Sequence, residues 1–179
     1  YSPPNSGDVP DLVRSLGNWL VEDPPDLHPI IKAGLAHIHL VAIHPFWDGN
    51  GRTARALMTL ILQRTHFGFR KLLSLESTFA NPRERYIEAI ERTLGTQFNP
   101  TYDASPWLEF YAPMLLASVM QLTNQLTEWH RMMEELHTEF RRVGLSEREV
   151  DGLAFAIHTG RITRGDYIEI AGVSPITAS

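Results

Sequence analysis

The segment from Pro29 to Ile43 constrains the fold of this chain more than any other part of the sequence. Read as a helix, it carries apolar side chains on almost every side, and a helix that is apolar all round is buried. Pro45 disfavours helical backbone angles in the residue before it, so this helix must end near His44. The sequence therefore predicts a central helix, which other elements have to cover.

Helical signals also fill most of the remaining chain. Asn81 followed by Pro82 has the residue types of a helix N-cap and a first helical position, and Ser105 followed by Pro106 repeats them. No segment shows a convincing strand pattern. The predicted fold class is therefore all-α, a helical bundle with helices over residues 9–22, 29–43, 52–62, 82–94, 105–143, 147–158 and 163–171.

A stripe of apolar residues marks the long helix that follows Ser105. Between Leu115 and Val143 these residues alternate spacings of four and three, which is typical of a helix packed along another helix. The partner can be a helix of the C-terminal tail or of a second copy of the chain in a homodimer. The third arrangement is a helix lying on its own core, and the sequence leaves all three open.

Composition excludes several classes of protein. The chain has 179 residues and no cysteine, which excludes disulfides, thiolate metal sites and a cysteine nucleophile. A net charge of −5 argues against a broad nucleic-acid or membrane surface. No apolar run approaches the ~20 residues of a membrane span. We therefore expect a cytoplasmic protein without membrane contact.

The chemistry of the chain is concentrated in the segment His44–Arg55, which reads His-Pro-Phe-Trp-Asp-Gly-Asn-Gly-Arg-Thr-Ala-Arg. Two glycines flank Asn50 and allow left-handed backbone angles, so that successive amides can point into one concavity. This nest runs into a helix N-terminus, whose free amides favour an anion. Arg52 and Arg55 lie three apart on the first helical turn. Together these features predict a polyphosphate site.

Asp48 and His44 add a metal ligand and a base to this site. Asp48 would repel a phosphate unless a divalent cation lies between them, and Mg²⁺, or Mn²⁺ in its place, bridges carboxylate and phosphate oxygens. The imidazole of His44 is suited to taking a proton from an incoming hydroxyl. His37 and His39 cannot join such a metal site together, because residues two apart on a helix point about 200° away from each other.

Three other interpretations of the segment compete with this one. Asp-Gly-Asn-Gly is also an ordinary turn, but a turn does not need the histidine and the two arginines. An EF-hand loop that began at Asp48 would need a glutamate where Thr59 stands. A Walker loop would need Gly-Lys-Ser or Gly-Lys-Thr, which does not follow.

The segment resembles in full the signature of the Fic family, His-x-Phe-x-Asp/Glu-Gly-Asn-Gly-Arg-x-x-Arg. This resemblance implies a Fic-fold helical bundle with the active-site loop between two central helices. It also implies transfer of AMP from ATP to a Ser, Thr or Tyr hydroxyl of a target protein, with release of pyrophosphate. Another phosphoryl-type transfer is one alternative, although Doc-like relatives carry Lys where Gly51 stands. A transcriptional regulator that senses nucleotide is the other.

The resemblance also implies a role for each residue of the signature. His44 is the expected general base, Phe46 is the expected anchor of the loop in the core, and Asp48 is the expected metal ligand. The two arginines are expected on the β- and γ-phosphates. The expected ATP phosphate site consists of Gly49, Asn50, Gly51, Arg52, Thr53 and Arg55.

The resemblance extends beyond the loop, to residues 1–143 as a Fic domain. Residues 1–12 resemble the end of the family's flap, which aligns the target's backbone, and Tyr86 is expected to border the nucleobase pocket. Residues 144–179 resemble the truncated beginning of a winged helix-turn-helix, which adds DNA to the expected partners. Many Fic enzymes are inhibited by a helix whose glutamate pairs with the second arginine, here Arg55, and we expect such a helix before Tyr1.

Overall fold

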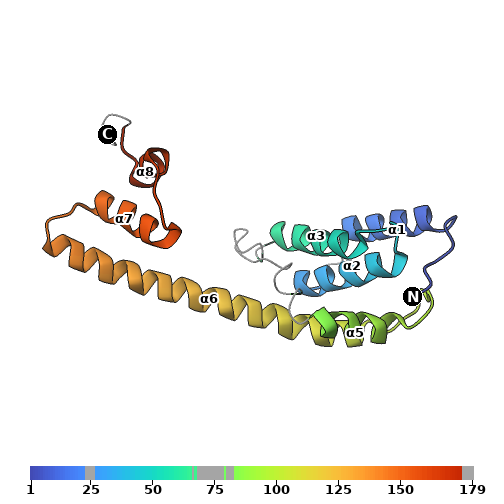
Figure 1. Ribbon diagram of the computed structural model, residues 1–179. Helices are drawn as coiled ribbons and strands as arrows, with labels where there is room; N and C mark the ends of the chain where they lie inside the picture. The colour runs from blue at the N-terminus through green and yellow to red at the C-terminus, as the bar shows by residue number, and fades with distance from the viewer. Residues whose placement is uncertain (23–26, 66, 68–78, 80–82, 175–179) are drawn as a thin grey trace. The chain divides into compact units, whose positions relative to one another are not determined.

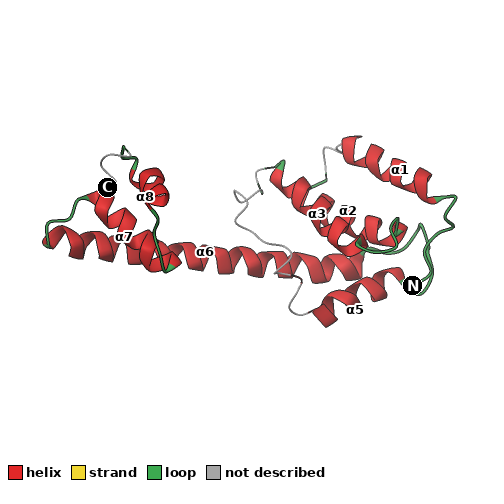
Figure 2. Cartoon of the chain, turned by 45° about the horizontal axis from the view of Figure 1, so that its top comes forward, coloured by secondary structure: helices red, strands yellow, loops and turns green. Residues whose placement is uncertain are grey.

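The computed structural model describes residues 1–22, 27–65, 67, 79 and 83–174, and most of them are helical (Figures 1 and 2). Its helices are α1 (Val9–Glu22), α2 (Pro29–Ile43), α3 (Asn50–Gln63), α5 (Arg83–Leu94), α6 (Ser105–Arg142), α7 (Glu147–Thr159) and α8 (Arg164–Ala171). These residues contain no strand, and Ser2 and Gln97 form an isolated parallel bridge. The predicted all-α class is confirmed. The N-cap predicted at Asn81 lies outside the described residues.

The chain divides into two compact units, Tyr1–Leu122 and Thr123–Ser179. The boundary falls inside α6, so this helix contributes to both units. The boundary predicted from the sequence, between a Fic domain of residues 1–143 and a winged helix-turn-helix of residues 144–179, stays a prediction.

α2 is the central helix of the first unit, as its sequence predicts. Most of its residues are buried, and α1 and α3 pack against it. The side chain of Lys32 ties it to α1, because the ammonium group donates to the Leu20 carbonyl at 2.9 Å. Burial of so apolar a helix fixes the position of its C-terminal end, where His44 lies.

The first turns of α6 cross α2 at Gly34. The indole Nε1 of Trp107 donates to the Gly34 carbonyl at 2.7 Å, and a Cβ atom added at Gly34 would lie 2.6 Å from the Tyr111 ring. Trp107 and Tyr111 are fully buried, and both stack within an aromatic cluster that includes His37 and Tyr86. This cluster joins α2, α5 and α6.

In the second unit, α7 contacts the part of α6 that carries the apolar stripe. The rings of Trp129 and His158 meet edge to face at 4.7 Å, and His137 Nε2 lies 3.2 Å from an Asp151 carboxylate oxygen. The tail is therefore one partner of the stripe. Val143 at its end stays 73% exposed, and a second copy of the chain as a further partner stays a prediction.

Membrane insertion was not expected from the sequence. No helix within the described ranges is both long and apolar enough to cross a bilayer.

Candidate active site

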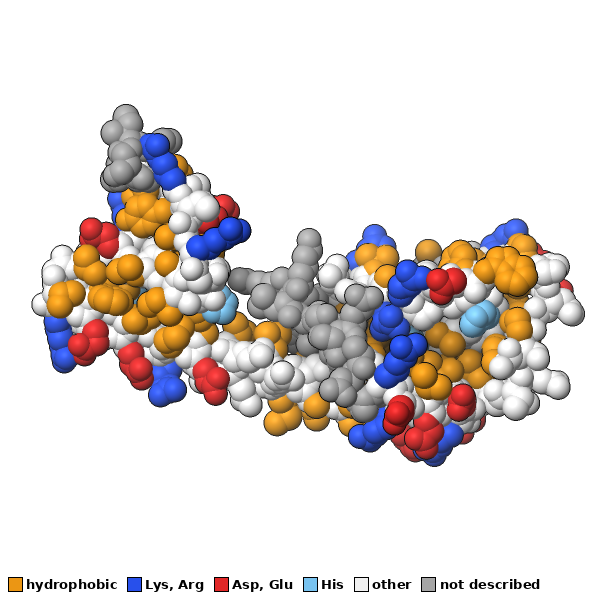
Figure 3. Space-filling model, viewed as in Figure 1, with side chains coloured by type: hydrophobic (Ala, Val, Ile, Leu, Met, Phe, Trp, Pro, Cys, Tyr) orange, Lys and Arg blue, Asp and Glu red, His pale blue; other side chains and the backbone are white. Residues whose placement is uncertain are grey.

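A cleft of about 530 Å³ opens in the first unit where α2 ends and α3 begins. On the face drawn in Figure 3, Lys and Arg side chains of this unit gather beside an apolar surface. The cleft is lined by His44, Trp47, Asp48, Gly49, Asn50, Gly51, Arg52, Arg55, Phe79, Arg83, Tyr86 and Ile87. Every site residue predicted from the sequence except Thr53 is among them.

His44 caps α2 in a left-handed conformation, with φ 53° and ψ 54°. Among the described residues other than glycine, no second one has a positive φ, and such angles outside glycine often mark functional positions. The His44 side chain is exposed, and its Nδ1 lies 3.4 Å from the carbonyl oxygen of Val41. A protonated Nδ1 donates to that oxygen, which leaves Nε2 as the atom that can accept a proton.

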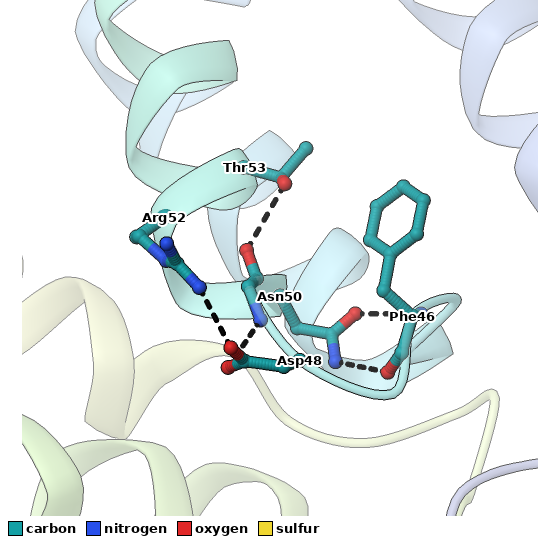
Figure 4. A network of polar contacts seen from close by, with 6 residues as sticks. Phe46, Asp48, Asn50, Arg52 and Thr53 are labelled. Carbon is teal, nitrogen blue, oxygen red and sulfur yellow. Dashed lines mark hydrogen bonds and ion pairs between the residues drawn. The ribbon is translucent and has the colours of Figure 1, made fainter.

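Asn50, at the start of α3, fixes the shape of the loop. Its Oδ1 accepts from the Phe46 backbone N–H at 2.9 Å, and its Nδ2 donates to the Phe46 carbonyl at 2.6 Å (Figure 4). The side chain is buried, so both ends of the amide are satisfied inside the protein. Asn50 therefore acts on the loop itself in this arrangement.

The anchoring role expected for the Phe46 ring is wrong. This side chain is 49% exposed, and Trp47 beside it is fully exposed. In Figure 4 the Phe46 ring points away from the hydrogen bonds that its own backbone makes. The loop is instead held by the Asn50 side chain, which bonds to the Phe46 backbone. The signature names both residues but does not reveal this contact.

Asp48 and Arg52, predicted for the metal and for a phosphate, are bonded to each other. Arg52 donates to an Asp48 carboxylate oxygen at 2.8 Å, and the other oxygen accepts from the Gly49 backbone N–H at 2.6 Å (Figure 4). The Asp48 and Arg52 side chains are 90% and 67% exposed, and such surface pairs contribute only about 0–1 kcal/mol. A bound anion or cation can therefore replace this pairing at little cost. Thr53 donates its hydroxyl to the Gly49 carbonyl at 3.0 Å instead of facing the cleft.

The two glycines of the loop serve different purposes. Gly49, the N-cap of α3, has φ 90°, which needs a residue without Cβ. Gly51 lies within the first turn of α3, with no positive φ. A Cβ there would approach an Arg55 nitrogen at 3.3 Å and the Tyr86 hydroxyl at 3.6 Å. The expectation that both glycines supply left-handed angles is therefore wrong for Gly51, where the requirement is space.

Below the cleft, Tyr86 points its hydroxyl into the protein. Its oxygen lies 3.1 Å from His37 Nε2. Burial raises the pKa of Tyr86, and the neighbouring Arg55 opposes that rise. Burial and then the Arg55 charge lower the pKa of His37 to about 3, so His37 is neutral near pH 7. The nucleobase contact expected of Tyr86 stays a prediction.

Sequence analysis missed four residues that line the cleft: Trp47, Phe79, Arg83 and Ile87. Arg83 begins α5, three residues before Tyr86 and on the same face of that helix. With Arg52 and Arg55 it makes the described lining cationic, which favours a polyanion. Helical spacing from Tyr86 was the available signal for Arg83.

The chemistry of the donor set fits a magnesium ion that is bound mainly through phosphate. Asp48 presents an exposed carboxylate on the cleft wall. Among the described residues there is no group of three or more His, Cys, Asp or Glu side chains that could hold a metal. Mg²⁺ commonly uses one or two carboxylates together with substrate phosphates and water. Asp48 can supply the protein's share of such a site.

The N-terminal residues lie beside His44. The Tyr1 hydroxyl donates to the Ala42 carbonyl at 2.9 Å, and the Tyr1 ring lies 6.4 Å from the His44 ring. Ser2 pairs with the backbone of residues 96–98, donating to Thr96 at 2.8 Å and accepting from Phe98 at 2.9 Å. An extended segment is thus held close to the rim of the cleft, where the flap was expected.

The part of the chain that contains His44, Gly49 and Gly51 is similar to proteins of a known family. The sequence model of the Fic/DOC family matches residues 1–62. Residues 1–62 of this chain are therefore similar to the Fic/DOC family. The Fic/DOC segment includes α1, α2, the His44–Arg55 loop and nearly all of α3.

Curated relatives match part of this chain. The chain is 52% identical over 68 residues to a protein adenylyltransferase Fic of Nematostella vectensis, a match covering 37% of this chain and 16% of the relative. A protein of the same name from Drosophila melanogaster is 48% identical over 68 residues, with 37% and 14% covered. The chain thus spans a small part of the length of these relatives.

A solved structure supports the fold over a longer range. The crystal structure of a Fic family protein from Desulfovibrio desulfuricans G20 matches 96% of this chain and 45% of its own, with a TM-score of 0.58 and 24% identity. At this identity the similarity concerns the fold. The Fic-fold helical bundle predicted from the sequence is confirmed.

Proposed function

We propose that this chain transfers AMP from ATP to a hydroxyl group of a target protein. The observation that carries the proposal is the position of His44, at the rim of a cationic cleft that leads to a helix N-terminus. The 3.4 Å contact of its Nδ1 with the Val41 carbonyl favours the tautomer that presents Nε2 as the acceptor. The names of the curated relatives, protein adenylyltransferase Fic, support the same reaction. They favour it over a regulator that only senses nucleotide.

The reaction follows from what each group of the cleft can do. The hydroxyl oxygen of the target attacks the α-phosphorus of ATP while His44 Nε2 takes the hydroxyl proton. A new oxygen–phosphorus bond forms, and the bond between the α-phosphorus and the oxygen that bridges to the β-phosphate breaks. Pyrophosphate leaves with the electron pair of that bond. The products are an AMP ester of the target and pyrophosphate.

The remaining cleft residues would bind and orient the phosphates. The backbone amides at the start of α3 and the guanidinium groups of Arg52 and Arg55 offer hydrogen bonds and positive charge to the β- and γ-phosphates. Asp48 would hold Mg²⁺ or Mn²⁺, which supplies neutralisation of phosphate charge when bound. To do so, Asp48 and Arg52 would exchange their mutual ion pair for the metal and the phosphate.

The protein partner is a substrate with an exposed Ser, Thr or Tyr. The half-exposed Tyr1 ring, 6.4 Å from the His44 ring, supports this because it puts an N-terminal side chain beside the proposed base, which a target hydroxyl must reach.

Labelled ATP tests the reaction directly. The chain is incubated with candidate proteins and Mg²⁺, once with ATP labelled at the α-phosphate and once with ATP labelled at the γ-phosphate. AMP transfer puts only the α-label on protein, and His44→Ala removes it. Labelling from the γ-phosphate would instead establish phosphoryl transfer, and no labelling of any protein by either substrate would contradict both reactions.

A further inference from the structure

A buried polar pair lies directly beneath the cleft and has no assigned role. His37, on α2, has no exposed surface, and its ring stacks on Trp107 with centroids 4.4 Å apart and planes 10° apart. Its Nε2 lies 3.1 Å from the hydroxyl oxygen of Tyr86 on α5. Tyr86 is 8% exposed and lines the cleft. Burying polar groups inside an aromatic cluster costs free energy unless they are hydrogen-bonded, so the placement of this pair needs an explanation.

The Tyr86 oxygen keeps room for another hydrogen-bond donor. His37 Nδ1 is buried and has no hydrogen-bond partner among the described residues. The tautomer of His37 decides whether Nε2 or the Tyr86 hydroxyl is the donor of the hydrogen bond between them. A hydroxyl has two acceptor positions, so in both cases the Tyr86 oxygen can accept a further hydrogen bond.

Arg55 lies beside this acceptor position. Its charge and a hydrogen bond from it oppose the rise that burial causes in the pKa of Tyr86. Both groups converge on Gly51, where a Cβ would lie 3.3 Å from Arg55 Nη1 and 3.6 Å from the Tyr86 oxygen. The neutral His37 can share a hydrogen bond with the same hydroxyl without repelling the guanidinium, whereas a charged imidazolium would repel it.

We propose that Tyr86 is a positioning residue for Arg55, and that His37 sets the direction of the Tyr86 hydroxyl. The hydroxyl holds the guanidinium at the Gly51 end of the cleft before any anion binds. This inference rests on the proposed binding of a polyphosphate in the cleft, and it assigns Tyr86 to the phosphates instead of the nucleobase. An arginine loses much rotamer freedom when it is fixed, so fixing it in advance strengthens anion binding.

Calorimetric titration with inorganic tripolyphosphate measures the affinity of the cleft for a polyphosphate. This probe has no nucleoside, so no AMP can be transferred from it. Tyr86→Phe removes one oxygen, and His37→Phe keeps a ring to stack on Trp107 but removes its nitrogens. Each should weaken tripolyphosphate binding about fivefold to tenfold, the net contribution of one typical hydrogen bond. Phe110→Leu is the matched control: it alters the same cluster, 6.4 Å from the Tyr86 ring, and should leave the affinity within about twofold.

A double-mutant cycle separates positioning from a merely structural role. If Tyr86 acts through Arg55, Tyr86→Phe should have no further effect on tripolyphosphate affinity in an Arg55→Ala chain. Independent losses in the two backgrounds would overturn the proposal, and so would unchanged affinity of the Tyr86→Phe chain. A loss of ATP affinity without a loss of tripolyphosphate affinity would return Tyr86 to the nucleobase.

The result does not depend on AMP transfer. If no protein is labelled but tripolyphosphate affinities follow the expected pattern, the positioning role stands and the proposed reaction fails. If the parent chain does not bind tripolyphosphate, the positioning role fails. Circular dichroism of each variant checks that it is folded before the titration.

Discussion

The Nδ1 atom of His44 lies 3.4 Å from the carbonyl oxygen of Val41, within the last turn of the helix that His44 caps. This contact favours the tautomer with the proton on Nδ1, so Nε2 is left to accept a proton from a substrate. The left-handed backbone of His44 turns the ring toward the exposed rim of the cleft. One backbone conformation thus sets both the place and the chemical form of the proposed base.

Replacing His44 should abolish AMP transfer without preventing ATP binding, because the imidazole serves the hydroxyl and not the phosphates. His44→Asn is the sharper variant, since asparagine tolerates left-handed backbone angles better than alanine. We expect transfer to fall by about 10²–10⁴-fold in both His44→Asn and His44→Ala, and the ATP dissociation constant to stay within about threefold. Transfer within tenfold of the parent rate would contradict the role of His44.

Asn50→Ala should loosen the loop, because it leaves the Phe46 N–H and carbonyl without their buried partner. Loss of such a buried hydrogen-bonding group costs about 1–3 kcal/mol of unfolding free energy. Urea unfolding measures this loss. Asn99→Ala removes an exposed side chain that accepts from Thr101 within its own turn, and it should cost less than about 0.5 kcal/mol. Equal losses in the two variants would show that Asn50 does not hold the loop.

Asp48→Asn should raise the Mg²⁺ requirement of transfer, and it should strengthen ATP binding when no metal is present. In Mg²⁺ the variant loses the carboxylate ligand, so about tenfold more Mg²⁺ should be needed for half-maximal transfer. In EDTA it should bind ATP more tightly than the parent, because a negative charge is gone and Arg52 is released. Asp11→Asn breaks a comparable exposed pair with Arg14, outside the cleft, and should change neither quantity. An unchanged Mg²⁺ requirement would rule out Asp48 as the metal ligand.

Acid should destabilise the chain partly through His37. Its folded-state pKa of about 3 lies below the ordinary value of 6.5, so between these values the unfolded chain binds a proton that the folded chain does not. The resulting stability is complete above pH 6.5 and is lost as the pH falls toward 3. Between pH 7 and pH 4 this amounts to about 3 kcal/mol.

The His37→Phe chain isolates this contribution. Urea unfolding of parent and variant at the two pH values gives the difference, and the parent should lose about 3 kcal/mol more than the variant. His130→Phe, at a 77% exposed side chain, should show little such difference. Parallel pH dependence of the parent and the His37→Phe chain would mean that His37 does not titrate as described.

Gly34→Ala should destabilise the first unit, because its Cβ would lie 2.6 Å from the Tyr111 ring and 3.1 Å from Leu108. Overpacking of this kind costs about 1–3 kcal/mol. Gly17→Ala in α1 meets nothing within 4 Å, and it should stabilise the chain by up to about 1 kcal/mol. Thermal unfolding compares the two. A stable Gly34→Ala chain would show that α2 and α6 can separate at their crossing.

The sequence by itself determined the helices and the content of the site. The apolar surface of Pro29–Ile43 required burial, and Pro45 required the end of α2, because both effects are local properties of side chains and backbone. Of the residues between His44 and Arg55 that line the cleft, all except Trp47 were predicted as site residues from the sequence. Local periodicity and local sterics are enough for such conclusions.

Only the tertiary structure decided which atoms of these residues meet. Asn50 holds the loop where Phe46 was expected to, and Gly51 provides room where a left-handed angle was expected. Tyr86 meets His37 and Arg55 across three helices, at a sequence separation of 49 residues from His37. Such contacts depend on how distant helices pack. Packing depends on the shapes of both surfaces together, and neither segment contains that information alone.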